Sequence, residues 1–161
     1  MNAQEKILSF NALKKRLLSD RRRGKKIVFT NGCFDLLHIG HVAYLEKAKK
    51  KNSVLVIGLN SDRSVRRIKG QHRPIVPEKE RAYILAALSV VDYVVIFNED
   101  TPQRTIEVLK PDVLVKGADW KGKTVAGGES VKSYGGKVEF IKFLPNRSST
   151  NIIQTVLQKC K

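Results

Sequence analysis

The sequence predicts a single-domain α/β protein: a Rossmann-like, doubly wound sheet of five parallel strands, preceded by an N-terminal helix. Three observations predict this fold class. Five short apolar runs lie along the chain, helical patterns separate them, and the connections between runs and helices are short. The length of 161 residues suits one domain with one core.

The five apolar runs are the expected strands. They are continuous rather than alternating with polar residues, as in strands that a parallel sheet buries on both faces. They cover residues 27–31, 54–59, 93–97, 112–117 and 138–144. In such a fold the loops after the strands meet at one edge of the sheet, so we expect the chemistry to lie directly after each strand.

Helix signals fill the intervals between these strands. Some segments show apolar residues at helical spacing, and in others a capping residue or a proline predicts the start and a glycine pair or a proline predicts the end. The expected helices cover residues 41–51, 78–88, 101–110, 127–134 and 148–157. Residues 1–24 are expected to form an amphipathic helix that packs on the outside of the domain.

Composition limits the class of protein. No apolar run approaches the roughly 20 residues of a membrane span, and the polar N-terminus lacks a signal-peptide pattern, so we expect a cytoplasmic protein without a membrane partner. Cys33 and Cys160 show no zinc-site spacing, and we expect free thiols and no metal site in the protein.

The net charge of +16 leaves two classes of function open. A basic domain either binds nucleic acid or acts on small anionic substrates. No nucleic-acid recognition pattern is visible, and the aromatic residues are not interleaved with the basic ones. We therefore favour the enzyme, expect no nucleic-acid partner, and keep a basic nucleic-acid-binding module as the alternative.

The segment after the first strand, residues 30–41, carries the strongest signal. It contains neither a dinucleotide-binding nor a P-loop pattern; instead His38 and His41 flank a glycine where a helix is expected to begin. A helix start offers free backbone N–H groups and a positive partial charge, which suits phosphate. Gly40 and Gly32 would let a nucleotide approach the backbone closely. A metal site is the other possibility for the histidines, but no third ligand is nearby.

The stretch GCFDLLHIGH resembles the HxGH signature of the nucleotidyltransferase superfamily, which includes cytidylyltransferases and several adenylyltransferases. In that superfamily the two histidines contact the triphosphate and stabilise the transition state at the α-phosphorus. The resemblance implies these catalytic roles for His38 and His41, and it makes residues 25–161 the nucleotidyltransferase domain. We assign Phe34 to nucleotide binding and Asp35 to the substrate, where it would reach magnesium through water.

Basic residues follow the second strand, in residues 60–74. A solvated loop is the usual meaning of such a run, but the resemblance points to Lys69 and Arg73 as phosphate contacts, and we count Lys69 among the catalytic residues. Asp62 is assigned to the substrate, with a structural role as the alternative. Arg81 opens the next helix, where it either binds substrate phosphate or pairs with a neighbouring glutamate.

Polar residues also follow the fourth strand, in residues 116–123. Lys116 and Gly117 lie where the base or ribose of a nucleotide could meet the backbone. Asp119 and Trp120 are expected to close over the substrate, although the usual role of a single tryptophan is packing.

Three consecutive hydroxyl residues follow the fifth strand. Ser148, Ser149 and Thr150 stand at an expected helix start, and capping that helix requires only one of them. The segment resembles the ISTT-type motif of the superfamily, which holds the β- and γ-phosphates. Here Ser149 replaces the commoner threonine and Arg147 takes an apolar or variable place.

Over residues 25–157 the chain resembles heptose 1-phosphate adenylyltransferases, in stretches 29–41, 58–88, 99–120 and 148–153. The resemblance implies transfer of AMP from ATP, with Mg²⁺, to D-glycero-D-manno-heptose 1-phosphate. The products would be pyrophosphate and ADP-heptose for the lipopolysaccharide core. It also implies a separate heptose kinase as the source of the sugar 1-phosphate, and we expect a homo-oligomer. A cytidylyltransferase acting on glycerol 3-phosphate or a similar small phosphate is the nearest alternative.

Overall fold

The computed structural model describes residues 1–145 and 147–160, which contain one five-stranded sheet. The strands are β1 (Lys26–Gly32), β2 (Ser53–Asn60), β3 (Tyr93–Phe97), β4 (Val113–Gly117) and β5 (Lys137–Ile141). They are all parallel and lie in the order β3-β2-β1-β4-β5. The order runs outward from β1 in both directions, which confirms the predicted doubly wound fold.

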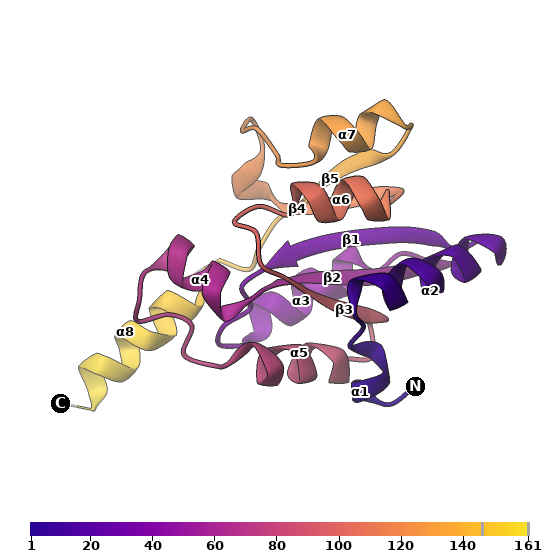
Figure 1. Ribbon diagram of the computed structural model, residues 1–161. Helices are drawn as coiled ribbons and strands as arrows, with labels where there is room; N and C mark the ends of the chain where they lie inside the picture. Colours follow the sequence, from indigo (N-terminus) through magenta and orange to yellow (C-terminus); the bar gives the residue numbers. More distant parts are fainter. Residues whose placement is uncertain (146, 161) are drawn as a thin grey trace.

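Helices cover both faces of the sheet (Figure 1). The α-helices are α1 (Ala3–Lys6), α2 (Phe10–Arg22), α3 (Ile39–Ala48), α4 (Asp62–Lys69), α5 (Glu78–Ala87), α6 (Gln103–Leu109), α7 (Gly128–Ser133) and α8 (Ser149–Lys159), and η1 (Ala118–Trp120) is a 3₁₀ turn. Apolar side chains of α3 and α5 pack on one face, and those of α2, α6 and α7 pack on the other.

The strands alternate between these two apolar layers. In β1, Ile27 and Phe29 face the layer with α2, whereas Val28 faces the layer with α3 and α5. Every residue of β2 is buried. Because both faces are covered, each strand needs apolar residues at consecutive positions, which accounts for the continuous runs in the sequence.

The N-terminal segment differs from the single helix expected over residues 1–24. It forms two helices, each with its own cap: the side chain of Asn2 accepts from Glu5 N at the start of α1, and that of Ser9 accepts from Ala12 N at the start of α2. Between them Leu8 N donates to Val94 O of β3. In α2 the apolar side chains Leu13 and Leu17 are buried against the sheet, as expected of an amphipathic helix.

A second difference lies in the basic segment after β2. Residues 62–69 form the helix α4 rather than a loop, because the Ser61 side chain accepts from Ser64 N and caps the helix start. The helix places Lys69 in its last turn. Within the described ranges, no helix combines the length and the apolar content that crossing a membrane requires.

Candidate active site

A cavity of ≈ 470 Å³ opens at the carboxyl edge of the sheet. The loops after β1, β2, β4 and β5 and the start of α8 all contribute to its lining. The residues singled out from the sequence that line it are Gly32, Phe34, Asp35, His41, Lys69, Arg73, Lys116, Gly117, Asp119, Trp120, Ser148, Ser149 and Thr150. His38 lines an adjoining cavity of ≈ 340 Å³ against α8. The fold thus gathers segments that are more than 100 residues apart in the sequence.

The two histidines form a stacked pair at the start of α3. Their ring centroids are 3.9 Å apart and the ring planes differ by 25°. His38 caps the helix, since its Nδ1 accepts from Gly40 N at 3.1 Å. Within residues 1–145 and 147–160, His38 Nε2 and His41 Nδ1 are buried without a hydrogen-bond partner. Buried polar atoms are normally paired, so these two nitrogens mark a place for a ligand.

Gly40 is required for this arrangement. A Cβ at this position would lie 2.9 Å from the His38 ring and 3.1 Å from Cβ of Arg147. Only a glycine lets the histidine cap fold back over the helix start while the segment before α8 approaches it. This close packing explains why the glycine stands between the two histidines.

Both imidazoles are neutral near pH 7. Burial, and then the neighbouring His38, lowers the pKa of His41 to about 4. Burial, and then the charge of Arg147, lowers the pKa of His38. Because Nδ1 of neutral His38 accepts a hydrogen bond, its proton resides on Nε2, which is then a free donor.

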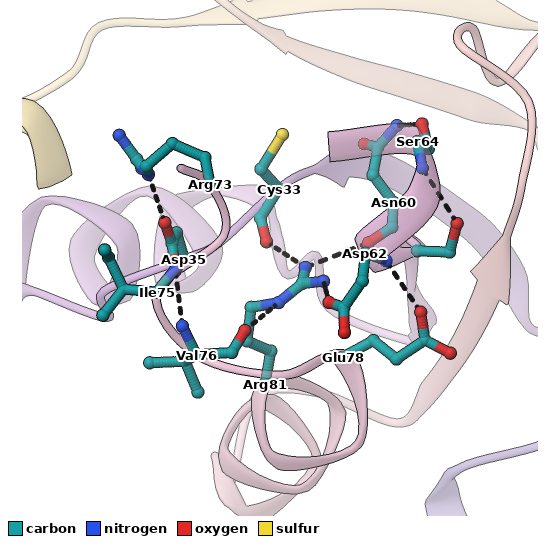
Figure 2. A network of polar contacts seen from close by, with 11 residues as sticks. Cys33, Asp35, Asn60, Asp62, Ser64, Arg73, Ile75, Val76, Glu78 and Arg81 are labelled. Carbon is teal, nitrogen blue, oxygen red and sulfur yellow. Dashed lines mark hydrogen bonds and ion pairs between the residues drawn. The ribbon is translucent and has the colours of Figure 1, made fainter. Parts of the chain in front are cut away.

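Asp35 lies at the cavity, but its carboxylate is used inside the protein (Figure 2). Oδ2 accepts from Arg73 Nε at 2.5 Å, and Oδ1 accepts from Ile75 N at 2.8 Å and Val76 N at 3.0 Å. Burial alone would raise the pKa of Asp35, but these hydrogen bonds, those from the Val76 and Ile75 backbone first, hold it below its usual value. Asp35 is therefore ionised and fixes Arg73 at the cavity.

Lys116, the last but one residue of β4, carries a buried ammonium group. Its Nζ donates to Asn31 Oδ1 at 2.5 Å and lies 5.4 Å from the centre of the Trp120 ring. Burial lowers the pKa of Lys116 to about 8, against the opposing effect of the Asp119 charge. The partners that the structure gives this cation are a neutral amide and an indole ring, so an anion in the cavity would find it available.

The hydroxyl residues at the start of α8 have different partners. Ser148 caps the helix by accepting from Asn151 N at 3.1 Å. Ser149 Oγ donates to Leu36 O at 3.0 Å, which joins the α8 start to the loop before the histidine pair. Thr150 lines the cavity. The two helix starts are thus held beside one another.

Asp62 and Arg81 lie behind the cavity wall. Arg81 Nη2 donates to Asp62 Oδ1 at 2.7 Å, and the Arg81 side chain is 0% exposed (Figure 2). Neither residue is among those that line the cavity. The structure therefore does not bring these two candidates together with the rest.

Several lining residues were missed by reasoning from the sequence. Tyr44 packs against Phe143 with ring centroids 5.0 Å apart, and its hydroxyl shares a 2.8 Å hydrogen bond with Thr30. Tyr44 lies one helical turn after His41, a spacing that could have identified it. Asn31 is polar at the carboxyl end of a buried strand, which is a similar signal.

No group of three or more His, Cys, Asp or Glu side chains suited to a metal ion occurs within the part of the chain that the structure describes. The charged groups that line the cavity include the cations Lys69, Arg73 and Lys116. With two helix starts and the neutral histidine pair, this lining suits a polyanionic ligand such as a triphosphate.

Comparisons with known proteins agree with this geometry. A family model described as cytidylyltransferase-like matches residues 29–155. The bifunctional protein HldE of Geobacter metallireducens is 58% identical over 157 residues, which are 98% of this chain and 32% of that protein. The bifunctional protein HldE of Syntrophotalea carbinolica is 59% identical over 140 residues, 87% of this chain and 29% of that protein.

A solved structure is also similar. It is the lipopolysaccharide core biosynthesis protein from Thermoplasma volcanium, with a TM-score of 0.60 and 30% identity. The match covers 74% of this chain and 96% of that one. The chain spans only about a third of the length of the curated relatives it matches. Since the family model includes the histidine pair, the cavity lining and the start of α8, this chain belongs to the cytidylyltransferase-like family.

Proposed function

We propose that this chain is an adenylyltransferase that joins AMP from ATP to the phosphate of a heptose 1-phosphate and releases pyrophosphate. One observation carries the proposal: two helix starts, that of α3 with His41 of the stacked pair and that of α8 with its hydroxyls, border the same cavity. The Ser149–Leu36 hydrogen bond holds them together. Each helix start supplies positive partial charge to phosphate.

The triphosphate would lie between these helix starts and the cations of the opposite wall. His38 Nε2–H and the His41 ring would contact the α-phosphate and the bridging oxygen. Lys69 and Arg73, which line the same cavity, would hold the departing β- and γ-phosphates together with the α8 start. Magnesium enters this proposal as part of the substrate MgATP.

The nucleophile in this proposal is an oxygen of the sugar phosphate. It is already anionic near neutral pH, so the protein need not supply a base. A bond forms between that oxygen and the α-phosphorus while the bond from the α-phosphorus to the β-phosphate oxygen breaks, and the electron pair leaves with pyrophosphate. The protein contributes positioning and stabilisation of the developing charge.

Lys116 is placed to hold one of the two anionic substrates. Its ammonium group is buried beside Asn31 at the cavity, with Asp119 and Trp120 in the following turn. A phosphate at this point would neutralise a cation that burial disfavours. The backbone at Gly117 is the proposed contact for the ribose or base of the nucleotide.

The choice of heptose rests on the relatives. Several proteins named bifunctional HldE match with 53–59% identity, and the adenylyltransferase domain of HldE proteins is the part this chain resembles. The solved relative is named for lipopolysaccharide core biosynthesis. We therefore propose ADP-heptose for the lipopolysaccharide core as the product. We also propose a cytoplasmic location, a kinase as the source of the sugar phosphate, and a homo-oligomeric state.

A substrate panel tests the proposal. Purified protein is incubated with MgATP or MgCTP and with heptose 1-phosphate or glycerol 3-phosphate, and pyrophosphate release is followed. We expect release with ATP and heptose 1-phosphate at a rate well above the other combinations. Turnover with CTP and glycerol 3-phosphate would instead support the cytidylyltransferase alternative, and no release from any pair would contradict a nucleotidyltransferase.

A further inference from the structure

Arg81 is a charged side chain enclosed by the fold. It lies in the first turn of α5, and its guanidinium group sits inside a ring of oxygen acceptors (Figure 2). The Nε atom donates to Val76 O at 2.8 Å. Nη1 donates to Cys33 O at 2.5 Å and to Asn60 O at 2.9 Å. Nη2 donates to Asp62 Oδ1 at 2.7 Å.

These acceptors come from four separate segments: the loop after β1, the last residue of β2, the start of α4 and the segment before α5. Three of them are backbone carbonyl groups, and a buried carbonyl needs a hydrogen-bond donor. A guanidinium group carries five N–H donors in a fixed planar fork, whereas a lysine ammonium group carries three on one atom. Only arginine can therefore serve all four acceptors from the position of Arg81.

The same segments carry the cavity residues. The Val76 carbonyl accepts from Arg81, while the Val76 N–H donates to Asp35 at 3.0 Å. Asp35 in turn holds Arg73 at the cavity. This gives a continuous set of contacts from Arg81 through Val76 and Asp35 to the Arg73 guanidinium.

A second set of contacts leads to Lys69. Asp62 is the first residue of α4, and Lys69 is the last. Two contacts fix Asp62. The Asp62 side chain accepts from Arg81, and the Asp62 backbone N–H donates to Glu78 Oε2 at 2.7 Å. The orientation of α4, and hence the position of Lys69, depends on this anchored start.

We propose that Arg81 is a positioning residue: it sets the places of Arg73 and Lys69 at the cavity without contacting a substrate. It does so by holding the ends of β1 and β2 against the starts of α4 and α5. The proposal deepens the proposed function, on which its activity measurement rests. Displacing a binding group by about 1 Å can cost 10²-fold in rate, so small movements of these cations would be visible.

The first experiment compares two substitutions that each remove a buried hydrogen bond. Arg81→Lys keeps the positive charge but removes the planar set of guanidinium N–H donors. Tyr93→Phe removes the bond from Tyr93 Oη to Asp20 Oδ2, 3.0 Å long, at the opposite edge of the sheet. Both variants are assayed well below their melting temperatures. We expect kcat/KM for ATP to fall roughly 10- to 100-fold in Arg81→Lys and to stay within twofold of wild type in Tyr93→Phe.

The second experiment does not depend on catalysis. Cys33 is half-buried, lines the cavity and has its carbonyl held by Arg81, so its thiol reports the order of that loop. In a Cys160→Ser background, which removes the exposed thiol, the rate of Cys33 labelling by a disulfide reagent is measured. We expect a several-fold faster rate in Arg81→Lys and no change in Tyr93→Phe.

Equal kcat/KM and equal labelling rates in the two variants would overturn the proposal and leave Arg81 a purely structural residue. If Arg81→Lys does not fold, Asp62→Ala decides, since it removes one acceptor and leaves the three carbonyl bonds. A lower kcat/KM in that variant supports the proposal, and wild-type behaviour contradicts it. If the wild-type protein releases no pyrophosphate, the proposed function fails while the labelling rates still test the positioning role.

Discussion

The two walls of the cavity use their charged groups in opposite ways. The paired wall, formed by Asp35 and Arg73 at the cavity and backed by Asp62 and Arg81, joins each carboxylate to a guanidinium group at 2.5 or 2.7 Å. The open wall, formed by His41 and Lys116 with His38 stacked beside them, holds buried nitrogens that have neutral partners or none within the described residues. The paired wall resembles a scaffold, and the open wall retains capacity for an anion.

This difference separates stability from function. An unpaired buried polar group costs about 1–3 kcal/mol, so the open wall is a destabilising feature of the fold without ligand. The paired wall recovers stability because its charges are mutually satisfied. Substitutions on the open wall should therefore reduce activity with little loss of stability, whereas substitutions on the paired wall should reduce stability together with activity.

The largest effect is expected from the histidine pair. His41→Ala should lower kcat by about 10²–10³-fold, the usual loss for one group that stabilises transition-state charge. The melting temperature should stay close to that of the wild type, because Nδ1 of the ring makes no hydrogen bond within the described chain. Pyrophosphate release and thermal denaturation measure the two quantities. His72→Ala, at an exposed histidine, is the matched control; full turnover in His41→Ala would remove the catalytic role.

Lys116→Met sharpens the comparison, since it removes a buried cation and keeps the apolar stem. We expect kcat/KM to fall about 10²-fold while the melting temperature rises or stays constant, because burial disfavours the ammonium group. Lys121→Met, at an exposed lysine of the next turn, should change neither. A large loss of stability would place Lys116 on the paired wall instead.

Asp35→Asn should lower stability, unlike the two substitutions on the open wall. It leaves the Arg73 guanidinium group without its carboxylate, and we expect a loss of about 2–3 kcal/mol in the free energy of unfolding. Urea denaturation measures this loss. The control is Asp100→Asn, which alters an exposed ion pair with Arg67 and should cost about 0–1 kcal/mol. Equal losses in the two variants would show that the paired wall is not a special source of stability.

The pH dependence of stability should give the smallest effect. Between pH 6.5 and 4 the unfolded His41 binds a proton that the folded one does not, because its folded pKa is about 4. This contribution is therefore complete above pH 6.5 and is lost as the pH falls toward 4. From pH 7 to pH 5 it amounts to about 1–2 kcal/mol.

His41→Asn should reduce that acid-induced loss, and His72→Asn should leave it unchanged. Melting temperatures at pH 7 and pH 5 for the three proteins provide the measurement. If all three lose the same stability, His41 is not held neutral in the folded protein.

Much of the fold could be predicted from the sequence, and the reason is local. Continuous apolar runs such as residues 54–59 indicate strands that are buried on both faces of the sheet, and glycine or hydroxyl residues indicate where helices begin and end. Helix α4 was not predicted, because its basic residues resemble those of a solvated loop. The signal for its start is a single capping hydrogen bond, from Ser64 N to the Ser61 side chain.

The site was predicted less completely. A motif places a residue after a strand but does not give the direction of its side chain. Asp35 and Arg81 both follow recognisable motifs, yet Asp35 binds the backbone of Ile75 and Val76, and Arg81 points behind the cavity. The contact of Asn31 with Lys116, from a distant part of the sequence, arises only through strand pairing.

The central claim is that a triphosphate binds between the two helix starts, against the histidine pair. Nuclear magnetic resonance of the imidazole groups tests it most directly, with the magnesium complex of a non-hydrolysable ATP analogue as the ligand. The account predicts that the signals of His38 and His41 shift and their pKa values rise as the ligand saturates, while the signal of His72 stays in place. Unchanged His38 and His41 signals, under conditions where calorimetry shows the analogue to be bound, would contradict it.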